Sequence, residues 1–190
     1  MVVRKTASLC PEPPPLERGL DPRVDANTRV LLLGSFPGRA SLDAGHYYAH
    51  PRNAFWPIMA DLTSQPDLID QPFETRYRAL NAAGVGLWDL YTQARRRGSL
   101  DAAIRDAQVA DLKHLLTRRL PQLRAIAFNG RTAARGRRVV LALGRELQLI
   151  DLPSTSPAHA VLSRDEKIAQ WRAALLPVLH DSAVPPRGTR

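Results

Sequence analysis

Short apolar runs alternate along the chain with longer segments that have the spacing of amphipathic helices. Each run is bounded by glycine, proline or polar residues, which is typical of a buried parallel strand. The predicted strands are residues 29–33, 85–89, 124–128 and 148–152. Such alternation favours a parallel sheet with helices on both faces. We therefore expect an α/β fold, a three-layer α/β/α sandwich with a short, mostly parallel four-stranded sheet.

Helices are predicted between and after these strands. Asn53 suits the N-cap of a helix that runs to Leu62, and Ser163 with Glu166 has the spacing of a capping box. Glycine or proline marks the ends of several others. The predicted ranges are 54–62, 73–83, 107–120, 131–143 and 164–179.

The two ends of the chain differ from the part between them. Residues 1–25 are polar and proline-rich, so we expect partial order there, and residues 183–190 resemble a loose tail. The intervening residues 26–182 fit a single domain. Cys10 is the only cysteine, which excludes an internal disulfide and a cysteine-based metal cluster. No apolar run approaches the ~18 residues of a membrane span, and we expect a cytoplasmic monomer without membrane partners.

The charge balance points to a polyanionic partner. The chain has 27 Lys+Arg against 18 Asp+Glu, a net charge of +9 and a pI near 10.7. Nucleic acid is the simplest such partner, whereas the alternative is a protein from a GC-rich genome in which arginine is common everywhere. Arginines at 95–97 and between 131 and 138 fit contacts to a DNA backbone or, equally, a solvated surface.

The four predicted strand ends lead into the most polar and aromatic short segments of the chain. These are residues 34–53, 89–91, 129–130 and 153–159. In an open parallel sheet, ligands bind beyond the carboxyl ends of the strands, so these segments should converge on one site. Segment 34–53 mixes aromatic, cationic and amide side chains, which suits a flat, hydrogen-bonding ligand such as a nucleobase.

Four motifs on these segments make the chain similar to the uracil-DNA glycosylase superfamily. They are GSFPG at 34–38, YYAHPRNAFW at 47–56, GVGLWD at 84–89 and STSPAH at 154–159. The chain most resembles the hypoxanthine-DNA glycosylase branch, family 6, and beside it the mismatch-specific uracil/thymine glycosylases. The resemblance covers residues 28–176. It implies cleavage of an N-glycosidic bond in DNA without a metal or another cofactor.

The resemblance also implies roles for individual residues. Tyr48 would stack on a flipped base, and Asn53 would be the catalytic residue of the hypoxanthine branch. Phe36 stands where the superfamily has an Asn or Asp that places the attacking water, and Ser154 stands where it often has a His. Asp89 takes the place of an Asn that reads the base edge. The structural alternatives are a packing role for Tyr48, a helix cap for Asn53 and a loop cap for Asp89.

Other candidates follow from side-chain chemistry. Ser35 and Phe36 would bind the base through backbone groups of the first motif, and Arg39 could hold the departing oxygen or a phosphate. A carboxylate at Asp89 suits a ring N–H, whereas a base oxygen would require its protonated form. The candidates for contact with the DNA backbone are Ser154, Ser156, His159 and Arg131. Their alternatives are a polar turn and a solvated surface.

These features predict a monofunctional DNA glycosylase that excises uracil, hypoxanthine or both in base excision repair. The superfamily favours uracil and the nearest branch favours hypoxanthine, and we lean slightly towards uracil. One alternative is a non-catalytic module that binds lesions or DNA, because Phe36 cannot hold a water. A weaker alternative is a hydrolase of free nucleosides or nucleotides.

Overall fold

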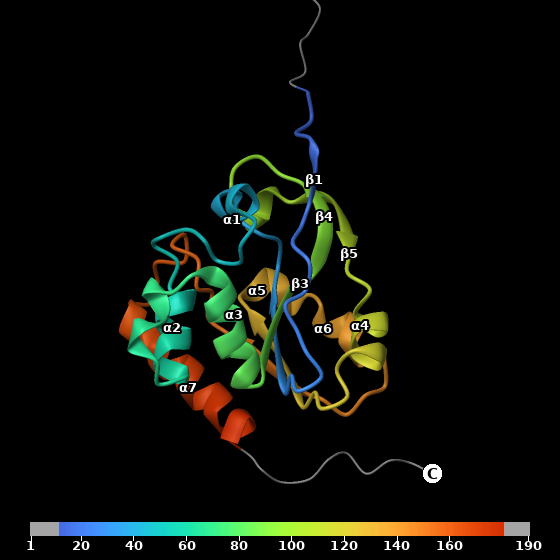
Figure 1. Ribbon diagram of the computed structural model, residues 1–190. Coiled ribbons are helices and arrows are strands. Elements are labelled where there is room, and N and C mark those ends of the chain that lie inside the picture. The colour runs from blue at the N-terminus through green and yellow to red at the C-terminus, as the bar shows by residue number, and fades with distance from the viewer. Residues whose placement is uncertain (1–11, 181–190) are drawn as a thin grey trace, which may run out of the picture.

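A four-stranded parallel sheet forms the middle of three layers (Figure 1). The computed structural model describes residues 12–180, so Cys10 and the tail expected at 183–190 lie outside the described residues. The strand order is β3-β2-β6-β7. The strands are β2 (Val30–Gly34), β3 (Val85–Asp89), β6 (Ala125–Asn129) and β7 (Gln148–Leu152). The predicted sandwich is confirmed, and each strand lies within one residue of its predicted position.

Alternate residues of β2 supply the two halves of the core. Val30 and Leu32 pack into one apolar cluster, and Leu31 and Leu33 into the other, as the two-residue period of a strand requires. Helices α2 (Phe55–Leu62), α3 (Phe73–Ala82) and α7 (Arg164–His180) cover the first face. Helices α4 (Leu112–Arg118), α5 (Arg131–Ala134) and α6 (Arg137–Leu141) cover the second (Figure 1).

The helix caps follow the sequence in two places. Ser163 N donates to the Glu166 carboxylate at 2.8 Å, and Glu166 N donates to the Ser163 hydroxyl at 3.2 Å, so the predicted capping box starts α7. At α2 the N-cap position belongs to Ala54, while Asn53 Oδ1 accepts from Phe55 N at 3.0 Å. The helix thus begins one residue later than predicted, and Asn53 lies just before the N-cap, the position that the sequence assigned to it.

Two predicted helices are wrong in extent. The range 107–120 is divided between β5 (Arg105–Val109) and α4, because Asp111 caps α4 by accepting from His114 N at 2.9 Å. The range 131–143 is two helices, α5 and α6, which meet at Gly136. A Cβ at Gly136 would lie 2.9 Å from Leu90, so the chain packs too closely on the sheet for a larger residue.

A second, antiparallel sheet stands beside the strand ends and has the order β1-β4-β5. It combines β1 (Leu16–Arg18), β4 (Tyr91–Arg95) and β5, so part of the proline-rich segment is paired with the domain. The shorter elements are α1 (Arg39–Ala44) and the 3-10 turns η1 (Pro66–Asp70) and η2 (Asp101–Ala103). Within residues 12–180, no helix has both the length and the apolar character needed to cross a membrane.

Candidate functional site

The ends of β2 and β3 place Asp89 at the base of the predicted site. Gly34 and Asp89 are register partners, and the Asp89 side chain lies across the end of β2. A Cβ at Gly34 would stand 2.2 Å from Asp89 Oδ1 and 3.3 Å from the Tyr48 hydroxyl. Glycine at position 34 therefore lets a carboxyl and a phenol approach the same strand end.

The Asp89 carboxyl is buried and incompletely hydrogen-bonded. The residue is 4% exposed, and Oδ2 has no hydrogen-bond partner. Burial raises the pKa of Asp89 to about 8, the negative charge of Asp101 adds to this rise, and Arg96 opposes it. At neutral pH the carboxyl is therefore mostly protonated, with one hydroxyl donor and one carbonyl acceptor.

Tyr48 has an unusual backbone and a defined ring position. Its φ is +54°, in the left-handed region that side chains other than glycine seldom adopt. Its ring stacks on Phe55 with the centroids 3.8 Å apart and an angle of 17°. No ring other than Phe55 stacks on Tyr48 within residues 12–180, so one face is free of stacking partners. The strain and the one-sided stack are consistent with a ligand platform.

Asn129 connects Tyr48 to the second motif. Its Nδ2 donates to the Tyr48 hydroxyl at 3.2 Å and to Thr155 Oγ1 at 3.0 Å. Its Oδ1 accepts from Thr155 N at 3.0 Å. The sequence placed Asn129 only at a strand end and gave it no role. Its amide in fact holds together the aromatic loop and the loop that follows β7.

The first motif is held by two charged residues: Asp101, which the sequence did not single out, and Arg96, which it assigned to a DNA-backbone or solvated cluster. Ser35 Oγ donates to Asp101 Oδ1 at 2.8 Å. Arg96 is 5% exposed, and its guanidinium donates to the carbonyls of Phe36 and Pro37. The guanidinium also lies 5.1 Å from the centre of the Phe36 ring. Burial lowers the pKa of Arg96. Arg96 therefore stabilises the first motif from a buried position. It is neither solvated nor placed at the surface for contact with DNA phosphates.

The backbone of the first motif keeps two donors available. The N–H groups of Ser35 and Phe36 have no hydrogen-bond partner among residues 12–180. They follow directly on Gly34, the register partner of Asp89. Preorganised backbone donors of this kind stabilise negative charge that develops on a ligand. The Phe36 side chain is buried, and binding of the base through the backbone of Ser35 and Phe36 stays a prediction.

Arg39 lies at the surface in a compensated charge cluster. Its guanidinium forms ion pairs with Asp43, at 2.8 Å, and with Glu17, at 2.5 Å. Its side chain is 59% exposed. No contact joins Arg39 to Tyr48 or Asp89 among the described residues. The predicted role of Arg39 in departure of the base stays a prediction.

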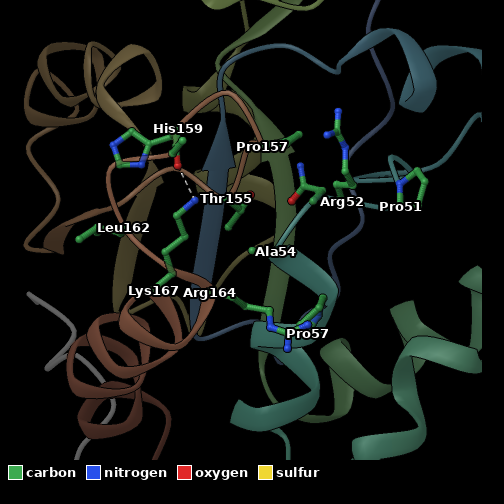
Figure 2. A pocket seen from close by; sticks show the side chains of 12 residues that line it. Pro51, Arg52, Ala54, Pro57, Thr155, Pro157, His159, Leu162, Arg164 and Lys167 are labelled. Atoms are coloured by element: carbon green, nitrogen blue, oxygen red, sulfur yellow. Dashed lines mark hydrogen bonds between the residues drawn. The ribbon is translucent and has the colours of Figure 1, made fainter.

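Tyr48, Asp89 and Asn129 together form a strand-end cluster. A cavity of about 340 Å³ opens beside this cluster (Figure 2). Asn53 and Thr155 line it, so it adjoins the Asn129 network through Thr155. Asn53 Oδ1 is engaged by Phe55 N, whereas Nδ2 makes no hydrogen bond to another residue within 12–180. The helix-capping and catalytic interpretations of Asn53 therefore use different atoms of one amide.

The loop after β7 forms another wall of this cavity. His159 lines it, its Nδ1 is buried without a partner, and its carbonyl accepts from Lys167 Nζ at 2.7 Å. Ser154 Oγ accepts from Ser156 N at 3.2 Å, and Ser156 Oγ accepts from Ala158 N at 3.3 Å. The two serines thus stabilise a polar turn, and phosphate contact through their hydroxyl protons stays a prediction.

The remaining candidates lie apart from the cavity or serve local structure. Arg131 is exposed at the start of α5. His50 Nδ1 accepts from Arg52 N at 3.1 Å and holds a turn, and His46 stacks on Phe73 at 4.3 Å. Within residues 12–180, no group of three or more His, Cys, Asp or Glu side chains could hold a metal ion.

Comparison with known sequences gives a consistent result. The profile of the uracil DNA glycosylase superfamily matches residues 22–180. A curated hypoxanthine DNA glycosylase of Methanosarcina acetivorans is 33% identical over 158 residues, which covers 83% of this chain and 97% of that protein. A hypoxanthine DNA glycosylase of Methanosarcina barkeri is 30% identical over 148 residues, which covers 78% and 92%.

The fold has a counterpart of known structure. A solution NMR structure from Methanosarcina acetivorans, described as a candidate uracil DNA glycosylase, superimposes with a TM-score of 0.71. The two sequences are 32% identical, and the match covers 83% of this chain and 98% of the other. The two proteins therefore share this fold over nearly the whole length of the solved structure.

Proposed function

The chain belongs to the uracil DNA glycosylase superfamily, and from this membership we propose that its strand-end site recognises the lactam edge shared by hypoxanthine and uracil. It is a DNA glycosylase that acts on deaminated bases in repair, by hydrolysis of the N-glycosidic bond. The finer assignment of bases and residues rests on the geometry of the site.

The neutral carboxyl of Asp89 carries the proposal. Deamination gives a base a carbonyl next to a ring N–H, and a protonated carboxyl offers the matching donor and acceptor. When the base departs, negative charge develops on its carbonyl oxygen. An ionised carboxylate would repel this charge, whereas the hydroxyl of a protonated Asp89 donates to it.

Three further groups complete the proposed site. The face of the Tyr48 ring opposite Phe55 stacks on the flipped base, a contact worth roughly 1–3 kcal/mol. The backbone N–H groups of Ser35 and Phe36 support the departing anion. Asn53 places the attacking water through its Nδ2 group, because the buried Phe36 ring cannot hold one.

A direct assay tests the activity and its specificity. Matched oligonucleotides carrying hypoxanthine, uracil or xanthine, in single-stranded and duplex form, are incubated with the protein and then treated with alkali to cleave abasic sites. We expect strand cleavage at hypoxanthine and at uracil, and none at adenine or cytosine in the same positions. Release of amino bases at similar rates would contradict lactam recognition.

A second measurement separates the enzyme from a binding module. The presence of Phe36 at the usual water-placing position favours the alternative that the fold binds lesions without cleaving them. Such a module would retain lesion DNA in a gel-shift assay while producing no free base. With Asn53→Ala, we expect retained lesion binding and a large loss of base release, which only a catalytic wild-type protein can show.

A further inference from the structure

The cavity beside the strand-end cluster has a strongly cationic wall. Its basic lining residues are Arg52, His159, Arg164 and Lys167, and no Asp or Glu lines it. Figure 2 shows that these residues come from three segments, with Arg52 before α2, His159 on the loop after β7, and Arg164 and Lys167 on α7. The arrangement concentrates positive charge without a protein counter-ion.

The two arginines that line the cavity differ from many other arginines of the surface. Arg52 and Arg164 have no ion-pair partner within residues 12–180. By contrast, six arginines pair with carboxylates of the same chain, namely Arg18, Arg23, Arg39, Arg95, Arg137 and Arg172. Glu166, next to Lys167 on α7, is engaged in the helix cap at Ser163. The charges at the cavity are therefore free for an external anion.

Lys167 adds an observation independent of surface charge. It is only 5% exposed, and within residues 12–180 its ammonium group makes one hydrogen bond, to the His159 carbonyl. A lysine ammonium has three donors, and burial without further partners is costly. His159 Nδ1 is likewise buried without a partner. An anion in the cavity would satisfy the ammonium donors of Lys167 that the fold leaves unused.

We propose that this cavity binds a phosphodiester group of the substrate strand next to the flipped nucleotide, with Lys167, Arg164 and Arg52 as its ligands. This proposal rests on the proposed function, because Asn53 lines the same cavity and would act on the sugar next to the bound phosphate. Its volume of about 340 Å³ exceeds that of one phosphate group. The phosphate would hold the strand in register while the flipped base approaches Asp89.

The site is tested by removing charges one at a time from the DNA backbone and from the protein. Lesion duplexes are made with one uncharged methylphosphonate at each linkage around the damaged base, in turn. The rate constant of base release at subsaturating enzyme is measured for the wild type, for Lys167→Met and for Lys113→Met. Methionine keeps much of the buried stem of Lys167, and Lys113 is an exposed lysine on α4 that serves as the matched control.

The proposal predicts coupling at one linkage only. There, the methylphosphonate should slow the wild type and Lys113→Met about tenfold, but Lys167→Met by a clearly smaller factor, because one of the three charge pairs with that phosphate is already lost. With unmodified DNA, Lys167→Met should reduce the slope of log affinity against log salt by about one. Arg52→Gln, at an exposed position, provides the same comparison should Lys167→Met fold poorly.

Two outcomes are distinguishable. Equal sensitivity of the wild type and both cavity variants to every methylphosphonate would overturn the phosphate site while leaving the glycosylase in place. Absence of base release by the wild type from any deaminated substrate would instead contradict the proposed function.

Discussion

Asn129 donates a hydrogen bond from Nδ2 to the hydroxyl of Tyr48 across 3.2 Å. The same amide holds Thr155 through two further hydrogen bonds. One side chain at the end of β6 thereby fixes both the ring proposed to stack on the base and the start of the loop beside the cavity. Buried networks of this kind are costly when one partner is removed.

Asn129→Ala should therefore lower both stability and activity. The substitution leaves Thr155 N without its acceptor in a buried position, which costs about 1–3 kcal/mol of unfolding free energy. Base release should fall because Tyr48 loses its hydrogen bond. Urea denaturation and kcat/KM measure the two effects, with the exposed Asn27→Ala as the control. An unchanged kcat/KM in Asn129→Ala would show that the network does not orient the site.

Tyr48 should tolerate loss of its hydroxyl better than loss of its ring. Tyr48→Phe keeps the aromatic ring and its stack on Phe55, whereas Tyr48→Leu removes both. We expect Tyr48→Leu to reduce kcat/KM by roughly five- to a hundredfold, from the worth of base stacking, and Tyr48→Phe to lose far less. Similar losses in the two variants would contradict a stacking role.

Much of this architecture follows from sequence, for local reasons. The four strands of the parallel sheet are short apolar runs between breakers, and their carboxyl ends converge because parallel strands share one polarity. The capping box at Ser163 is likewise local. The sequence therefore located Tyr48, Asn53 and Asp89 on converging segments, although it could not give their contacts.

What the sequence missed depends on long-range pairing. β5 was predicted as part of a helix, because its pairing with β4 outweighs the local pattern. The resulting second sheet brings Arg96 and Asp101 against the first motif, contacts for which the chain has no local signal. The same sheet brings Glu17 of β1 to Arg39, and so places that guanidinium in an ion pair.

Gly34→Ala should disable the site from its base. The added Cβ would stand 2.2 Å from Asp89 Oδ1, so the buried carboxyl must move. We expect a loss of about 1–3 kcal/mol in stability and a larger proportional loss of activity. Thermal unfolding and kcat/KM would show this, with Gly45→Ala as a control where a Cβ meets nothing within 4 Å but φ is +69°. Full activity of Gly34→Ala would contradict the role of Asp89.

The protonation of Asp89 should appear in stability as a function of pH. Its pKa is about 8 in the folded protein, against an ordinary value of 3.8 for an exposed aspartate, so the folded state binds more protons between these values. The free energy of unfolding should therefore fall as pH rises from about 4 to 8. Asp89→Asn removes this effect, and its stability relative to the wild type should increase over the same range, by an amount on the order of a few kcal/mol. Denaturation at pH 5 and pH 8 compares the two proteins, and a constant difference would contradict a protonated Asp89.

The charges around Asp89 should move the pH limit of activity in opposite directions. If protonated Asp89 donates to the departing base, kcat/KM should decline above pH 8 in the wild type. Asp101 raises the pKa of Asp89, so Asp101→Asn should shift the decline to lower pH. Arg96 lowers that pKa, so Arg96→Met should shift it to higher pH.

The opposite signs separate electrostatics from damage to the first motif. Both variants weaken contacts to that motif, and both are expected to lose some activity at every pH. Distortion of the first motif alone would lower kcat/KM by the same factor at every pH, or would shift the pH profiles of both variants in the same direction. Displacement to lower pH in Asp101→Asn and to higher pH in Arg96→Met is the result expected when the two charges set the protonation of Asp89.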